Sequence, residues 1–145
     1  MTSRTEAPAP PGSRVLTQAV ACDHRRAYQW TADPAHLPLW ASGLAEGAVT
    51  PVAGTDGHWQ VDAPGGRATL RFAPANDFGV LDHWVLPAGM AEVYVPFRVI
   101  ATGAGRCQLQ MTLLRQGGMD DATFERDSQW IARDLLALAH RLEAA

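Results

Sequence analysis

The histidine at position 83 is the residue of this sequence best placed to do chemistry. It lies in the segment 80–86, where alternation predicts a strand with Leu81, His83 and Val85 on its inner face. The opposite phase would bury Asp82, and a buried carboxylate costs more free energy than a buried imidazole. We therefore expect Asp82 to point outward, where Arg71 of the preceding strand can pair with it.

An inward histidine has two possible roles. It can bind the carbonyl or phenol of a ligand through a hydrogen bond, or act on it as an acid or base. It can also be an ordinary core residue whose ring nitrogens are satisfied by a backbone carbonyl or a tyrosine. The sequence leaves both open, and no other ionisable side chain is predicted inside; Tyr94 is the nearest alternative, if its strand is shifted in phase.

Other groups of reactive residues are better explained by local structure. Residues 22–24 (Cys-Asp-His) have ligand-type side chains, but no second pair accompanies them at metal-site spacing, so Asp23 is predicted to cap a helix. The pair Asp120 and Asp121 likewise starts a helix, and residues 103–105 (Gly-Ala-Gly) form a hairpin turn. The sequence contains no zinc-protease, phosphate-loop, dinucleotide or serine-hydrolase motif. We therefore expect no metal and no cofactor.

Length and composition place further limits on function. The chain has 145 residues, 47% of them hydrophobic, which predicts one packed domain over residues 14–145 after a disordered, proline-rich tail at residues 1–13. A formal charge of −3 argues against nucleic-acid binding, which needs a basic face. Without a long apolar run or a signal-peptide core, we expect no membrane insertion and a cytoplasmic location.

The elements alternate in a simple order. A strand over 14–21 is followed by two short helices that begin after Asp23 and Asp33. Short glycine- and proline-rich turns then separate six predicted strands, over 45–51, 58–62, 67–72, 80–86, 91–100 and 106–114. The order β-α-α-β6-α predicts an α+β fold with a curved antiparallel sheet and a C-terminal helix.

The C-terminal helix, from the cap at Asp120 to about Leu142, organises the rest of the chain. An apolar stripe at helical spacing runs along it: Phe124, Ile131, Leu135, Leu138 and Leu142. Trp130 lies beside this stripe and is predicted to pack under the first strand, with a dimer contact as the alternative. On the outer face of the sheet, Trp84, Tyr94 and Arg71 form either a partner site or a solvated Arg–Trp stack.

Three segments resemble the START-like helix-grip superfamily (SRPBCC), and within it the polyketide cyclase/dehydratase-like group. They are residues 33–44 (DPAHLPLWASGL), 80–85 (VLDHWV) and 117–138 (GGMDDATFERDSQWIARDLLAL). The resemblance implies a curved sheet wrapped around the long helix, with a mostly apolar cavity between them. Mapped onto this sequence, the expected ligand-binding walls are Trp40, Trp59, Phe72, Leu81, His83, Val95, Phe97, Met111, Phe124 and Ile131.

Three functions are compatible with this resemblance. The first is binding of a small apolar or aromatic metabolite or lipid in the cavity. The second is a polyketide-type aromatase/cyclase or dehydratase that uses His83 as its acid or base. The third is an interaction protein resembling the heat-shock-ATPase activators, which would have a filled interior. A homodimer is possible in each case, and a superfamily-level fold does not choose among them.

Overall fold

The structure, a computed structural model, describes residues 12–144. Residues 1–11 of the predicted tail lie outside the described part, and Ser13 already begins the first strand. In chain order the elements are β1 (Ser13–Val20), α1 (His24–Thr31), the short 3-10 helix η1 (Pro34–His36), α2 (Leu37–Trp40), β2 (Val49–Pro51), β3 (His58–Ala63), β4 (Gly66–Phe72), β5 (His83–Pro87), β6 (Val93–Val95), β7 (Phe97–Gly103), β8 (Arg106–Leu114) and α3 (Asp121–Ala144).

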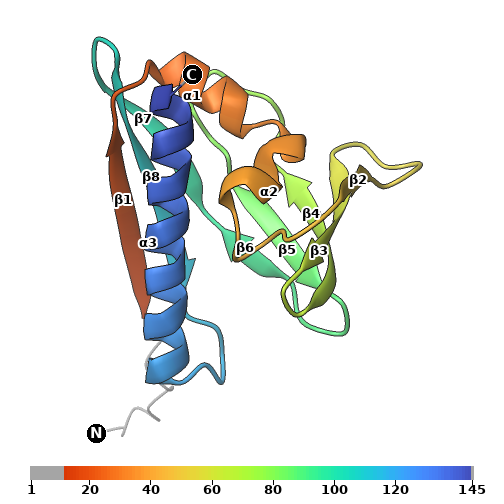
Figure 1. The fold of residues 1–145 in the computed structure, drawn as a ribbon. Coiled ribbons are helices and arrows are strands. Elements are labelled where there is room, and N and C mark those ends of the chain that lie inside the picture. Colours follow the sequence, from red (N-terminus) through yellow and green to blue (C-terminus); the bar gives the residue numbers. More distant parts are fainter. Residues whose placement is uncertain (1–11, 145) are drawn as a thin grey trace, which may run out of the picture.

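The strands form two antiparallel sheets where the sequence predicted one. The orders are β1-β8-β7 and β2-β3-β4-β5-β6. Figure 1 shows α3 running along the three-stranded sheet, while α2 lies between α3 and the five-stranded sheet. The expected α+β order of a strand, short helices, a run of strands and a long final helix is confirmed.

Pro96 separates the two sheets. The sequence predicted a single strand over 91–100, but β6 ends at Val95 and β7 begins at Phe97. Proline has no N–H to donate to a strand ladder, so regular pairing is interrupted there. The carbonyl of Pro96 still accepts a hydrogen bond from the Thr112 amide, at 3.0 Å. The chain thus passes from the edge of one sheet into the other without leaving the core.

A second connection between the sheets lies just before β5. Val80 forms an isolated antiparallel bridge with Arg98, and the Leu81 amide donates to the carbonyl of Phe97 at 2.8 Å. Gly79 has a φ of +71°, and a Cβ there would lie 2.2 Å from the carbonyl oxygen of Val99. Only glycine fits this close approach.

The predicted orientation of Asp82 is wrong. Asp82 is 6% exposed, and its carboxylate accepts hydrogen bonds from the Tyr94 hydroxyl (2.5 Å), the Phe97 amide (2.8 Å) and the Arg98 guanidinium. It precedes β5 at the junction of the sheets, so the side opposite His83 is covered by β7 rather than by water. Three donors offset the cost of burying the charge.

Arg71, the residue expected to pair with Asp82, has other partners. Its guanidinium lies 3.8 Å from Glu92 and 4.2 Å from the centre of the Trp84 ring. Trp84 in turn stacks on Tyr94 with ring centroids 5.1 Å apart. The Arg–Trp stack, one of the two interpretations of this outer patch, is therefore present.

The short elements before β2 follow their capping residues. Asp23 accepts from the amides of Arg25 and Arg26 at the start of α1, and Asp33 accepts from the Ala35 amide at the start of η1. The predicted strand over 45–51 was too long, because the amides of Leu44 and Ala45 both bond to the carbonyl of Ala41 in a turn. Only Val49–Pro51 remains extended.

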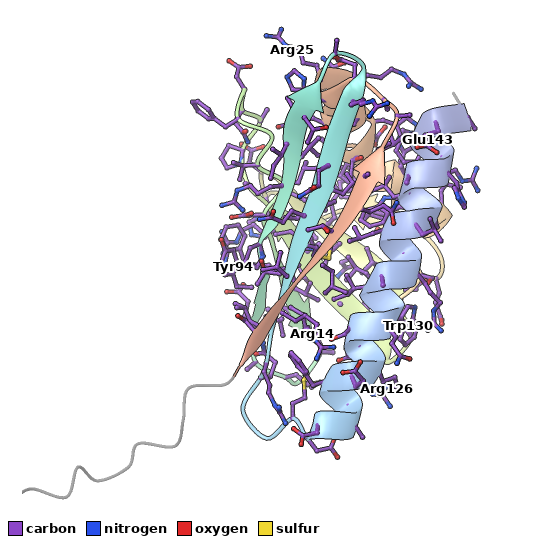
Figure 2. All side chains as sticks on the ribbon, turned by 90° about the vertical axis from the view of Figure 1, so that its left-hand side faces the viewer. Arg14, Arg25, Tyr94, Arg126, Trp130 and Glu143 are labelled. Carbon is purple, nitrogen blue, oxygen red and sulfur yellow. The ribbon has the colours of Figure 1, made fainter. Side chains whose placement is uncertain are left out.

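The C-terminal helix forms as predicted. The Asp120 carboxylate accepts from the Thr123 amide at 2.7 Å, and hydrogen bonding from the Thr123 side chain and amide lowers the pKa of Asp120. Near the start of α3, Glu125 pairs with Arg14 of β1, and near its end Glu143 accepts from the amide of Ala21, the residue after β1. Figure 2 labels Arg14 and Glu143. No helix in residues 12–144 has the length and apolarity to cross a membrane.

The Asp82 cluster should be a major source of stability. We expect Asp82→Ala to lower the free energy of unfolding by about 3 kcal/mol, because the buried Phe97 amide and the Tyr94 hydroxyl lose their acceptor. Urea denaturation measures this. As a control, Asp77→Ala removes an exposed carboxylate that has no hydrogen bond or ion pair in residues 12–144, and it should change stability by less than about 0.5 kcal/mol. Equal effects of the two substitutions would contradict the assignment.

Candidate functional site

A pocket of about 240 Å³ lies between α3, α2 with its following loop, and the strands β5, β6 and β8. Both sheets therefore contribute to its walls. The lining residues are Trp40, Ala41, Gly43, Leu44, His83, Val85, Val95, Met111, Leu113, Asp127, Trp130, Ile131 and Asp134. Most of these side chains are apolar, so the pocket suits a molecule with an apolar body.

His83 gives the pocket a hydrogen-bonding group. Its Nδ1 lies 3.0 Å from the carbonyl oxygen of Leu81, and the residue is 5% exposed. Burial lowers the pKa of His83 below the ordinary histidine value of 6.5, so the ring is neutral at pH 7. A neutral ring that donates from Nδ1 carries a lone pair on Nε2.

The Nε2 atom of His83 is available to a ligand. It has no hydrogen-bond partner in the described residues, and it is not one of the two fully buried unpartnered atoms there, Thr31 Oγ1 and Trp40 Nε1. Since His83 lines the pocket and Nδ1 is bound to main chain, we infer that Nε2 is the ring nitrogen a ligand there would meet. Nδ1 alone makes the main-chain hydrogen bond expected of a core histidine. The other proposed role, binding a ligand, therefore falls to Nε2.

Aromatic rings fix the orientation of this imidazole. Phe72 lies beside it with centroids 5.4 Å apart, and Phe97 meets it edge-on at 6.4 Å. Trp40 packs on Phe97 at 5.9 Å. These aromatic contacts fix the ring, and Nε2 keeps no hydrogen-bond partner in the described residues.

The structure divides the ten expected wall residues into two equal groups. Trp40, His83, Val95, Met111 and Ile131 line the pocket. The other five lie elsewhere.

Among those five, Phe72 and Phe97 support the imidazole, and Leu81 supplies its carbonyl partner. Trp59 pairs with Pro51 and Leu70 in the five-stranded sheet, away from the lining.

Phe124 was assigned to the wall and is instead buried under two arginines. The guanidinium carbons of Arg14 and Arg115 lie 5.0 Å and 5.3 Å from its ring centre. The apolar stripe correctly predicted that Phe124 faces inward, but β1 and the turn before α3 cover that end of the helix. Whether the five lining residues bind a ligand stays a prediction.

Eight lining residues were absent from the expected set. Val85 and Leu113 share strand faces with His83 and Met111, so alternation already pointed to them. Asp127, Trp130 and Asp134 fall on the same side of α3 as Ile131, at spacings of three or four residues. The loop residues Ala41, Gly43 and Leu44 belong to the segment 33–44 that carried the family resemblance, and neither helical spacing nor strand alternation pointed to them as wall residues.

Trp130 does not pack under β1 as predicted. It projects from the N-terminal half of α3 (Figure 2), and its Nε1 donates to Ser42 Oγ at 2.9 Å. Ser42 Oγ donates to Asp134 Oδ1 at 2.6 Å, and the Gly43 amide donates to Asp134 Oδ2 at 3.0 Å. These three bonds hold the loop after α2 against α3 at the side of the pocket.

Tyr94, the alternative acid or base expected from the sequence, does not complement His83 in this pocket. Tyr94 does not line the pocket, and its hydroxyl is bound to Asp82, which raises the pKa of the phenol. Within residues 12–144 no three histidine, cysteine or acidic side chains lie close enough together to hold a metal. Besides the carboxylates of Asp127 and Asp134, the lining supplies one neutral acceptor, His83 Nε2.

No family model matches the sequence, and no curated protein matches it. Several solved structures are similar to this chain. An uncharacterized protein from Bacillus thuringiensis aligns with a TM-score of 0.71 and 13% identity over 90% of this chain and 98% of that one. A START superfamily protein from Mycobacterium smegmatis aligns at 0.65 and 13% identity, covering 91% and 97%.

A third similar structure is DynU16, a protein of the dynemicin biosynthetic locus, with a TM-score of 0.67 and 17% identity. It covers 92% of this chain, which spans 48% of DynU16. At identities this low the likeness shows the fold alone. The chain has the START-like helix-grip fold, as the sequence resemblance implied.

The lowered pKa of His83 makes a pH-dependent contribution to stability. The unfolded chain binds a proton near pH 6.5 and the folded chain does so only at lower pH, so stability falls as the pH drops below 6.5. Urea unfolding between about pH 5 and 8 should show a larger loss in the wild type than in His83→Gln. NMR titration of the ring should give a midpoint below 6.5; a midpoint above it would contradict a buried neutral imidazole.

Proposed function

From the START-like helix-grip fold and its pocket, we propose that this protein binds a small apolar or aromatic metabolite beneath α3. The observation that supports the proposal most directly is a mostly apolar pocket whose wall carries an unpartnered neutral acceptor, His83 Nε2. Such a pocket combines area for hydrophobic contact with one orienting hydrogen bond. Trp40, Met111 and Val95 offer the contact area.

The volume of the pocket limits the size of the ligand that it can hold. An apolar cavity of about 150 Å³ accommodates benzene, so the present volume of about 240 Å³ fits a molecule of one or two rings. Long acyl chains need more space than this. We therefore favour a compact aromatic molecule over a lipid.

A cyclase or dehydratase is the second candidate function. His83 Nε2 could remove a proton from a bound carbonyl compound. The lining has two further ionisable side chains, Asp127 and Asp134, and neither shares a hydrogen bond with His83, so the geometry supports binding better than turnover. The interaction-protein alternative predicted a filled interior, and the pocket does not fit it.

Filling the pocket should abolish binding without unfolding the protein. Val95→Phe adds a ring to the wall, and we expect loss of thermal-shift responses to one-ring and two-ring aromatics at a melting temperature close to that of the wild type. Ile100→Phe is the matched control, because Ile100 is 39% exposed and outside the lining. Retained binding in Val95→Phe would place the ligand elsewhere, and native mass spectrometry of the purified protein would identify what co-purifies.

Loss of the His83 acceptor should lower the affinity for ligands that carry a hydrogen-bond donor and leave the affinity for hydrocarbons unchanged. His83→Phe keeps a ring but removes the acceptor, so phenol binding should weaken about tenfold, as expected for loss of one hydrogen bond. Benzene affinity should stay within about twofold. Isothermal titration calorimetry measures both. Equal phenol affinity in the two proteins would show that Nε2 does not contact the ligand.

A further inference from the structure

The pocket lining has an unbalanced set of charges. Its ionisable side chains in the described structure are His83, Asp127 and Asp134, and no arginine lines it. The buried His83 ring is neutral at pH 7 because burial lowers its pKa. Two carboxylates therefore face the pocket without a basic side chain in its wall, and this electrostatic field opposes an anionic ligand.

The two carboxylates are not equivalent. Both oxygens of Asp134 accept hydrogen bonds from the loop after α2, from Ser42 and Gly43. Asp127 has only an ion pair with Arg126, in which Nε and Oδ1 are 3.7 Å apart and the arginine is largely exposed. Asp127 Oδ2 has no partner in the part of the chain that the structure describes. This carboxylate is free to bind a donor from a ligand.

The aromatic ring next to Asp127 also suits a cation. Trp130 lies three residues further along α3 and lines the same pocket, and its bond to Ser42 fixes the indole. An ammonium group near a tryptophan face gains a cation–π attraction. Asp127 on one side and the indole on the other would therefore hold a positive group at the edge of an otherwise apolar pocket.

We propose that this pocket selects compact aromatic molecules that carry a protonated amine, and that it discriminates against carboxylates of the same size. The proposal rests on the binding function above and names the ligand class. The ring lies among Trp40, Val95 and Met111, and the amine lies at Asp127 beside Trp130. Any ring hydroxyl or N–H donates to His83 Nε2, at the inner end of the pocket.

Three probes of one shape test the charge preference: phenethylamine, phenethyl alcohol and phenylacetate. Affinities are measured by calorimetry or by NMR shifts at low salt. We expect the amine to bind about tenfold more tightly than the alcohol and the carboxylate to bind most weakly. The preference should shrink at high salt, because the mouth of the pocket is partly solvated.

The variant Asp127→Asn separates charge from shape. We expect it to lower amine affinity about tenfold and to leave alcohol affinity within about twofold. Asp77→Asn changes the net charge equally at an exposed position outside this pocket, and it should affect neither. An unchanged amine preference in Asp127→Asn would overturn the assignment of Asp127.

The remaining outcomes distinguish the two proposals. Equal binding of the three probes, or strongest binding of phenylacetate, would leave the binding function in place and overturn the preference for amines. If the wild type binds none of the three probes, and its response equals that of Val95→Phe at the same probe concentrations, both the binding function and the preference for amines are overturned.

Discussion

The buried carboxylate of Asp82 is the interaction on which the arrangement of this molecule depends. It accepts the hydroxyl of Tyr94 from the five-stranded sheet and the Phe97 amide from the three-stranded sheet, and it pairs with Arg98. A charge is buried only where enough donors replace water, so the two sheets must meet at this point. The chain enters β5 at the next residue, His83, and alternation turns that side chain to the opposite side. The position of the free imidazole nitrogen thus follows from the anchoring of its neighbour.

The pocket exists because the two sheets diverge from that junction while α3 stays with one of them. At the start of α3, Phe124 is covered by Arg14 and Arg115, and towards its end Leu135, Leu138 and Leu142 are buried. Between these packed regions, the helix faces the open angle next to α2. There Ile131 and Trp130 line the pocket. The same packing that stabilises the helix at both ends leaves its middle to line the pocket.

The chemistry of the lining favours recognition over catalysis. A base that is neutral at pH 7 and held by a backbone carbonyl has the properties of an orienting group. Acid–base turnover needs a second group placed over the reacting atoms, and Tyr94 is committed to Asp82. The acidic edge of the pocket, in contrast, is suited to a donor or a cation. At identities of 13% and 17% the likeness to solved structures shows the fold alone, and a fold does not decide what a pocket binds.

The sequence alone determined the local features: the type and order of most elements, the caps at Asp23, Asp33 and Asp120, the stripe of α3 and the inward side of His83. These depend on residues a few positions apart, through helical period, strand alternation and turn chemistry. Sequence reasoning missed the division of the sheet at Pro96, the burial of Asp82, the arginine cover over Phe124 and the place of Trp130. Each of these features depends on which segment, distant in the sequence, packs against the residue in the folded chain. The fold and half of the candidate wall residues could be predicted. Which residues line the pocket depends on the angle between the two sheets, and only the tertiary structure sets that angle.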